Sequence, residues 1–281
     1  MFKLDPSGDE TVLHTFTGGA DGYAPYGDLL LHEDGNLYGV ASNGGDVSGF
    51  CGATILNATD SLGCGTVFKL DGTSEFTVLH TFDGKDGGPF PDGWLVRDKM
   101  GNLYGMTGNG GDVSACSGIG CGVVFKLDRG GKESVLYSFT GGADGAVTFA
   151  SVIRDDAGNF YGTTTNGGDL NGCGGVGCGV VFKLDPNGKE TVLHTFSGGT
   201  DGAIPVAGLL LDDEGNLYGT ASGGGDPSCD CGVVFKIALH HCAEGDESIA
   251  TSSERTTLDG HQRAVQSVRL GRFGRPFMRP Q

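Results

Sequence analysis

The chain has 281 residues, with 35 acidic and 18 basic side chains and a formal net charge of −17. Such an excess of negative charge repels phosphate backbones and anionic lipid headgroups, so nucleic acid and membrane surfaces are not expected partners. No apolar run approaches the roughly 20 residues that a membrane-spanning helix needs, so we expect no membrane insertion. Glycine contributes 55 residues, and because it does not recur at every third position it indicates a turn-dense β-protein instead of collagen.

Three short strings recur in the same order, with a period of about 57 residues. FKL, or FKI in the last copy, begins at Phe2, Phe68, Phe125, Phe182 and Phe235. GNLYG or GNFYG begins at Gly35, Gly101, Gly158 and Gly215. VLHTF or VLYSF begins at Val12, Val78, Val135 and Val192. Because three independent markers keep one period, the chain is a tandem-repeat protein.

One repeat predicts four short strands separated by turn residues. Residues 208–213 (GLLLDD) and 216–222 (NLYGTAS) predict the first two, and a glycine-rich, cysteine-containing loop follows. The last two strands are seen in the preceding copy of the repeat, where residues 178–185 (CGVVFKLD) and 190–196 (ETVLHTF) predict them. Asn-Gly and Asp-Gly supply the hairpin turns. Four antiparallel strands per repeat predict an all-β fold, a β-propeller of four-stranded blades. A parallel β-helix and a single long sheet, which would leave bare edges, are the alternatives.

The number of strands of each type bears on the blade count. The FKL strand occurs five times, and every other strand occurs four times. We expect Glu10–Phe16 to complete the last blade beside Val233–Ile237 and close a four-bladed ring, with Phe2–Leu4 surplus or competing for the same position. A five-bladed ring with one incomplete blade is the next alternative, and a fragment of a larger ring is the third. Residues 1–237 form the repeat domain, and the non-repeat residues 238–281 are expected to be disordered.

The strings GVVFKLD, LHTF, GGADG and GNLYGTT carry a resemblance to a known repeat. From Phe2 to about Ile237 the chain resembles the GloVer-type tandem repeat of predicted extracellular bacterial proteins. Its strand order, with a D-x-x-G-N turn before an Asn-hydrophobic-Tyr strand, resembles NHL-type propellers. The resemblance implies a propeller outside the cytoplasm and implies little about activity.

Eight of the nine cysteines fall in the same loop of successive repeats. The pairs are Cys51 with Cys64, Cys116 with Cys121, Cys173 with Cys178, and Cys229 with Cys231, and Cys242 stands alone in the tail. We expect local disulfides, and hence an extracellular or periplasmic protein, although Met1–Leu4 opens within a repeat and carries no signal peptide. Zinc is the alternative, but a C-x4-C pair without a second pair nearby makes a poor tetrahedral site.

Two families of aspartates recur in the two connections that share one face of a propeller. The first family, in Asp-Gly turns, is Asp21, Asp86, Asp144 and Asp201, and the second, in the cysteine loops, is Asp46, Asp112, Asp169 and Asp226. Each can simply cap its glycine-rich turn. Gathered at a channel mouth, however, carboxylates raise one another's pKa and supply the acid and base of glycoside hydrolysis. No cofactor is expected, and Ca²⁺ is weakly indicated because the chain lacks a D-x-D-x-D-G loop.

Aromatic residues near the same face differ between repeats. They are Tyr23, Tyr26, Phe90, Trp94 and Phe149. Such side chains either stack on sugar rings or plug the central channel. We therefore predict an extracytoplasmic glycoside hydrolase, β-galactosidase-type if a bond must be named, acting on a saccharide as a monomer or small homo-oligomer. The alternative is a non-catalytic surface, adhesion or carbohydrate-binding propeller.

Overall fold

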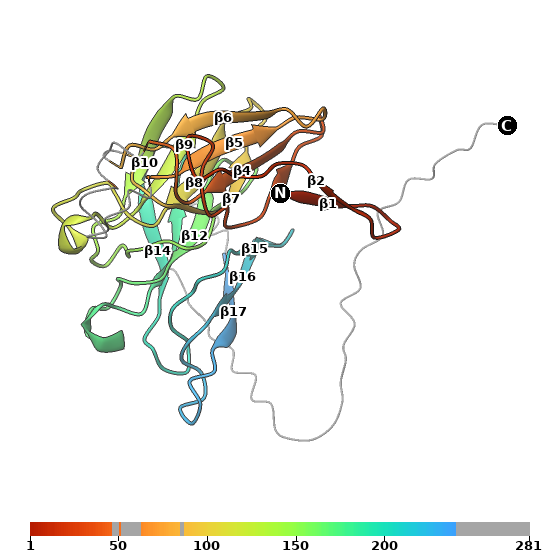
Figure 1. Cartoon of the computed structure of the whole chain (residues 1–281). Coiled ribbons are helices and arrows are strands. Elements are labelled where there is room, and N and C mark those ends of the chain that lie inside the picture. Colours follow the sequence, from red (N-terminus) through yellow and green to blue (C-terminus); the bar gives the residue numbers. More distant parts are fainter. Residues whose placement is uncertain (47–50, 52–62, 85–86, 240–281) are drawn as a thin grey trace.

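The computed structural model describes residues 1–46, 51, 63–84 and 87–239 (Figure 1). These residues fold into antiparallel sheets connected by turns and two short 3₁₀ helices, so the predicted all-β class is confirmed. Among them no helix is long and apolar enough to cross a membrane. Residues 240–281, which hold almost all of the predicted tail, lie outside the described residues.

Three complete four-stranded sheets follow one another along the chain, as blades of a propeller do. The first blade consists of β3 (Leu30–Leu31), β4 (Leu37–Ala41), β5 (Thr66–Leu70) and β6 (Phe76–Thr81). The second consists of β7 (Pro91–Arg97), β8 (Leu103–Thr107), β9 (Val123–Leu127) and β10 (Glu133–Ser138). The third consists of β11 (Ile153–Arg154), β12 (Phe160–Thr164), β13 (Val180–Leu184) and β14 (Glu190–Thr195). In each blade the spatial order of the strands is their order in the sequence.

The two ends of the repeat domain carry incomplete blades. A fourth blade has three strands, β15 (Leu210–Leu211), β16 (Asn216–Ala221) and β17 (Val233–Ala238). At the other end β1 (Phe2–Leu4) pairs with β2 (Glu10–Val12) in a separate two-stranded sheet. The predicted pairing of Glu10–Phe16 with the C-terminal strand is therefore wrong for this structure.

The register explains why β1 and not β17 pairs with β2. Phe2 lies opposite Val12 and Leu4 lies opposite Glu10, as Phe182 lies opposite Val192 within the third blade. The first FKL copy thus takes the position on β2 that a third strand takes in a complete blade, which is the competition expected for Phe2–Leu4. Closing a short hairpin costs less chain entropy than joining strands from opposite ends of the chain.

The recurring phenylalanines join each blade to the next. The FKL side chains of Phe68, Phe125 and Phe182 are fully buried, as are Phe82, Phe139 and Phe196 at the ends of the fourth strands. The ring centroids of Phe82 and Phe125 are 5.2 Å apart, and those of Phe139 and Phe182 are 5.1 Å apart. Such edge-to-face pairs stabilise a core beyond the area that they bury. The three clusters of buried side chains accordingly extend across blade boundaries.

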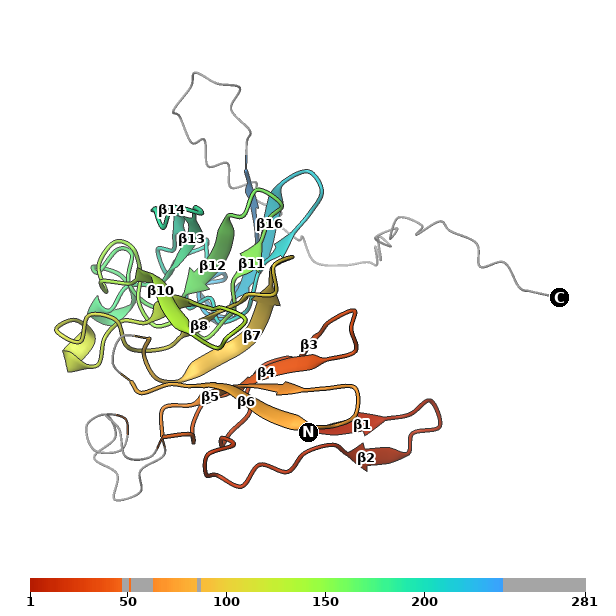
Figure 2. The ribbon, with the colours of Figure 1, turned by 90° about the horizontal axis from the view of Figure 1, so that it is seen from above.

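β7 contacts β3 and β4 of the first blade, and it lies between that blade and the strands of the third and fourth blades (Figure 2). Gly27 of the first blade lies so close to Gly93 of β7 that a Cβ on Gly27 would collide with the carbonyl group of Gly93. The hydroxyl of Ser151 in the third blade accepts a hydrogen bond from the Trp94 N–H and donates one to the Trp94 carbonyl oxygen. The Trp94 indole packs against Gly208 of the fourth blade, where a side chain would not fit. All four blades are therefore in contact through β7 or its neighbours.

Candidate functional site

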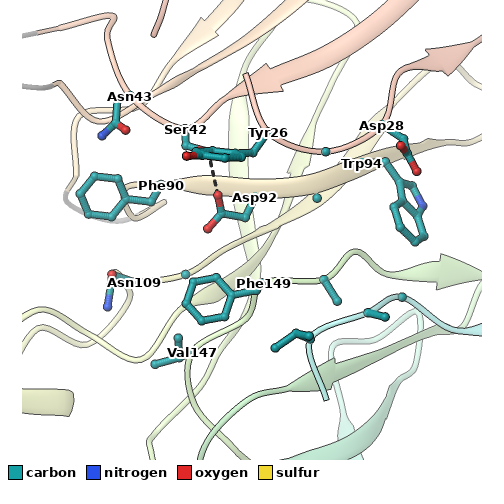
Figure 3. Close-up of a pocket in the computed structure, with 17 residues that line it drawn as sticks. Tyr26, Asp28, Ser42, Asn43, Phe90, Asp92, Trp94, Asn109, Val147 and Phe149 are labelled. Carbon is teal, nitrogen blue, oxygen red and sulfur yellow. Dashed lines mark hydrogen bonds between the residues drawn. The ribbon is translucent and has the colours of Figure 1, made fainter. Parts of the chain in front are cut away.

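A pocket of about 750 Å³ opens where the four blades converge, and we call it the axial pocket (Figure 3). Its walls come from the segments that lead into and form the first strands, with residues at the ends of β4 and β8. One repeat position, four residues after a glycine of positive φ, contributes Tyr26, Asp92, Phe149 and Val206. Residues distant in the sequence thus face one cavity because the repeats surround it.

Four of the five aromatic residues predicted to bind a saccharide line the axial pocket, namely Tyr26, Phe90, Trp94 and Phe149. Tyr26 and Phe149 keep 65% and 50% of their surface exposed, so their ring faces are accessible. Tyr23 is not part of the lining: its backbone forms an antiparallel bridge with Asn43, and its side chain is exposed elsewhere. The structure therefore brings together most of the predicted aromatic platform.

The rim of the pocket is held by the cysteine loop of the preceding blade. Phe90, Val147 and Ile204 occupy one repeat position with φ of 62°, 55° and 57°, a conformation that is costly for residues of this size. Their backbone N–H groups donate to the carbonyl oxygens of Cys64, Cys121 and Cys178 at 3.0, 2.8 and 3.0 Å. Each of these carbonyls belongs to a disulfide-bonded cysteine. The disulfide loops consequently fix the backbone that positions the pocket lining.

The predicted cysteine pairs are confirmed. The structure contains the disulfides Cys51–Cys64, Cys116–Cys121, Cys173–Cys178 and Cys229–Cys231. The second and third enclose the short helices η1 (Cys116–Gly118) and η2 (Cys173–Gly175). Cys242 lies outside the described residues. Four disulfides fit an oxidising environment, and among the described residues no group of three or more His, Cys, Asp or Glu side chains could hold a metal ion.

Asp92 is the carboxylate of β7 that faces the axial pocket. The Ser42 hydroxyl, from the neighbouring blade, donates to Asp92 Oδ1 at 2.7 Å and to the Pro91 carbonyl oxygen at 3.0 Å. Asp92 Oδ2 makes no hydrogen bond to any described residue. Burial raises the pKa of Asp92, and the hydrogen bond from Ser42 offsets only part of this effect.

Asp28 is the second carboxylate of the lining. It lies beside Trp94 at one end of the pocket, whereas Asp92 lies between Tyr26, Phe90 and Phe149 (Figure 3). Asp28 is exposed, and Asp92 is the more deeply placed of the two. The site therefore offers one desolvated and one solvated carboxylate among aromatic rings.

The two aspartate families, which we call the outer aspartate loops, do not gather at this pocket. In the first family Asp21, Asp144 and Asp201 accept hydrogen bonds from the backbone N–H and the hydroxyl of the residue four positions earlier. In the second family Asp112, Asp169 and Asp226 accept the backbone N–H two positions later, at 2.8–2.9 Å. None of the described members, Asp46 included, lines the axial pocket, and Asp86 lies outside the described residues.

Six of these carboxylates are engaged within their own loops, namely Asp21, Asp112, Asp144, Asp169, Asp201 and Asp226, as expected for residues that cap turns. Their crowding at a channel mouth stays a prediction. Hydrogen bonds from Ser114 lower the pKa of Asp112, and those from Ser228 lower the pKa of Asp226. Crowding would have raised both pKa values. A catalytic role for either family stays a prediction.

Sequence reasoning missed Asp92 and Ser42. The Asp92-Gly93 pair resembles the Asp-Gly turns found throughout the chain. An alignment of the repeats on the preceding glycine contains the missing signal, because Asp92 stands where the other repeats have Tyr26, Phe149 and Val206.

Comparisons with solved structures find distant likenesses. A gluconolactonase from Xanthomonas campestris is 14% identical with a TM-score of 0.43, over 78% of this chain and 61% of that one. A luciferin-regenerating enzyme is 14% identical with a TM-score of 0.46, over 76% and 61%. An α-L-arabinofuranosidase from Clostridium thermocellum is 15% identical with a TM-score of 0.38, over 77% and 68%. Likenesses this remote carry no argument about activity.

No curated protein matches the chain. A family model does match, over residues 1–176 and again over residues 48–256, and together these cover the whole repeat domain. The same residues contain the FKL, GNLYG and VLHTF strings and form the blades. The protein belongs to the Gloeobacter/Verrucomicrobia repeat family.

Proposed function

We propose that this protein is an extracytoplasmic carbohydrate-binding propeller and that its saccharide ligand occupies the axial pocket. The observation that carries the proposal is the cluster of Tyr26, Phe90, Trp94 and Phe149 around one cavity. The flat faces of aromatic rings match the C–H faces of sugar rings. The pocket volume of about 750 Å³ is in the range of small-molecule sites, which combine apolar walls with a few polar groups.

Two further properties support this proposal. The disulfides suit a protein that works outside the cytoplasm, where most polysaccharide is encountered. The net charge of −17 favours a neutral or cationic ligand over nucleic acid.

Isothermal titration with a panel of oligosaccharides tests the proposal. We expect at least one member to bind, and the Tyr26→Ala and Phe149→Ala variants to lose about tenfold or more in affinity each, because each loses a stacking face. Leu170→Ala is a matched control, since Leu170 is 47% exposed and does not line the pocket. Equal losses in the control and in the aromatic variants would contradict the proposed site.

Glycoside hydrolysis is the second candidate, and the observation that favours it is the pair Asp92 and Asp28. Hydrolysis needs a protonated carboxyl to donate to the leaving oxygen and an ionised carboxylate to activate water or attack the sugar. Burial raises the pKa of Asp92 toward the acid role, and Asp28 is the other carboxylate of the lining.

Chromogenic glycosides, a β-galactoside among them, test this second candidate. We expect turnover to be abolished by Asp92→Asn and by Asp28→Asn and to be kept by Asp112→Asn. Turnover that survives Asp92→Asn, or no turnover with any glycoside, would exclude hydrolysis through this pair.

A further inference from the structure

We infer that the saccharide bound in the axial pocket carries a protonated amino group, and that its ammonium pairs with Asp92. The inference rests on the proposed saccharide-binding function and names the class of sugar.

The Asp92 carboxylate has bonding capacity that the described residues do not meet. Ser42 engages Oδ1 and orients the carboxylate, and Oδ2 is left without a partner among the described residues. A desolvated carboxylate that is not paired costs free energy, so burial favours its protonated form. A ligand that brings a cation removes this cost, and a neutral hydroxyl removes less of it because hydrogen bonds between charged groups are the stronger ones.

The lining of the axial pocket is negatively charged. The described lining contains two carboxylates, Asp28 and Asp92, and no lysine, arginine or histidine. The protein as a whole carries a formal charge of −17. A negative cavity in a negative protein attracts cations and repels anions, so a sugar acid or phosphosugar is disfavoured.

Aromatic rings lie beside the Asp92 carboxylate. Tyr26, Phe90 and Phe149 surround Asp92 in the pocket (Figure 3). Aromatic faces attract ammonium groups, and the attraction grows when the cation is desolvated. The same rings stack on the sugar, so a single cluster recognises both parts of an amino sugar.

The inferred pairing also predicts how affinity depends on pH. The titratable groups of the lining are Asp92, Asp28 and Tyr26. Because the ammonium binds the ionised form of Asp92, affinity rises as pH rises through the pKa of Asp92 and falls again when the amine loses its proton. This role opposes the hydrolytic candidate, which requires Asp92 to be protonated.

The experiment is a titration of the full chain, with its disulfides intact, with four probes. They are the glucosamine tetramer, the N-acetylglucosamine tetramer, the β-1,4-linked glucose tetramer and tetramethylammonium. We expect the glucosamine tetramer to bind about tenfold more tightly than either neutral tetramer at pH 6 and low salt, as a cation held by a carboxylate and ring faces should. High salt should reduce this advantage.

Two variants assign the effect to residues. Asp92→Asn should remove the advantage of the glucosamine tetramer over the two neutral tetramers, whereas Phe149→Ala should weaken the binding of all three tetramers. Thermal unfolding and circular dichroism verify that both variants are folded, and Asp112→Asn in an outer aspartate loop is the matched carboxylate control. If Asp92→Asn does not fold, the pH profile of the unmodified protein gives the same test.

The outcomes separate the inference from the function on which it rests. Equal binding of all tetramers by a folded protein overturns the amino-sugar inference and leaves saccharide binding standing. Binding of no tetramer overturns both. Tetramethylammonium binding as tightly as the glucosamine tetramer overturns the saccharide part and supports the cation site.

Discussion

The axial pocket and the outer aspartate loops belong to the same repeats, yet the residues of the pocket differ between blades and the aspartates of the loops do not. In the described outer loops the aspartate is the same in every blade and caps its own turn. At the pocket position the blades contribute Tyr26, Asp92, Phe149 and Val206. Residues that are the same in every blade serve the folding of each blade, and we propose that the positions that differ between blades are those that recognise a ligand.

The largest expected effect concerns the repeated core. Replacing Phe182, which is fully buried and packs on Phe139, with alanine should lower the free energy of unfolding by about 3–5 kcal/mol, because it leaves a cavity between two blades. Denaturant unfolding measures the loss. Val234→Ala is the control, because Val234 is 81% exposed and should change stability little. Comparable losses in the two variants would contradict the core that we describe.

The next effect joins the two sides of the comparison. Replacing Cys116 and Cys121 together with alanine should lower the free energy of unfolding by about 2 kcal/mol, as expected for a bridge that closes a short loop. Because the Cys121 carbonyl holds Val147 at the pocket rim, ligand affinity should fall as well. The Cys229→Ala/Cys231→Ala variant lacks a described rim contact of this kind and should lose stability without loss of affinity. Unchanged affinity in the Cys116/Cys121 variant would show that this disulfide does not position the rim of the pocket.

A smaller effect depends on pH and lies away from the pocket. Burial, and next the charge of Asp144, raise the pKa of Glu190 to about 7 from its ordinary 4.5, and Tyr137 donates to the same Asp144 at 3.0 Å. A carboxyl whose pKa is raised by folding stabilises the folded protein in its protonated form. This contribution is fully present below the pKa of the unfolded chain and is lost as pH rises through the folded-state value of about 7.

Stability should therefore fall between about pH 4.5 and 7, by on the order of 1 kcal/mol after discounting for the partial exposure of Glu190. Glu190→Gln should flatten this part of the profile, as measured by thermal unfolding across pH. Glu133→Gln, at the same position of the second blade, is the comparison variant. If the stability of Glu190→Gln still falls over this pH range, another group causes the pH dependence.

The smallest effect tests the outer loops directly. Asp112→Asn weakens the hydrogen bonds from Ser114 and should lower stability only slightly, because they are exposed to solvent, with no change in ligand binding. Asp169→Asn should behave in the same way, because it occupies the same position one blade later. If only one of these two variants lost binding or turnover, the outer aspartate loops would have a functional role.

The repeat architecture could be predicted because each blade contains its own signals. Alternating strands, Asp-Gly and Asn-Gly turns and one cysteine pair per loop are local features, and the four disulfides follow from them. The aromatic platform was also predictable, because Tyr26, Phe90, Trp94 and Phe149 break the repeat at one loop.

Other features depend on contacts that no single repeat contains. Whether β2 pairs with β1 or β17 is decided by competition between two nearly identical strands, so strand counting alone cannot choose between them. In the sequence Asp92 looks like a turn residue, because Gly93 follows it. Its burial beside Ser42 arises only when the blades pack together. Burial set by convergence is a property of the assembled blades, and only an alignment of the repeats hints at it.

A crystal structure of the protein with the glucosamine tetramer tests the central claim most directly. Our account predicts sugar rings against Tyr26 and Phe149 in the axial pocket, with an amino nitrogen within hydrogen-bonding distance of Asp92. A tetramer bound instead at the outer aspartate loops, with the axial pocket unoccupied, would contradict it.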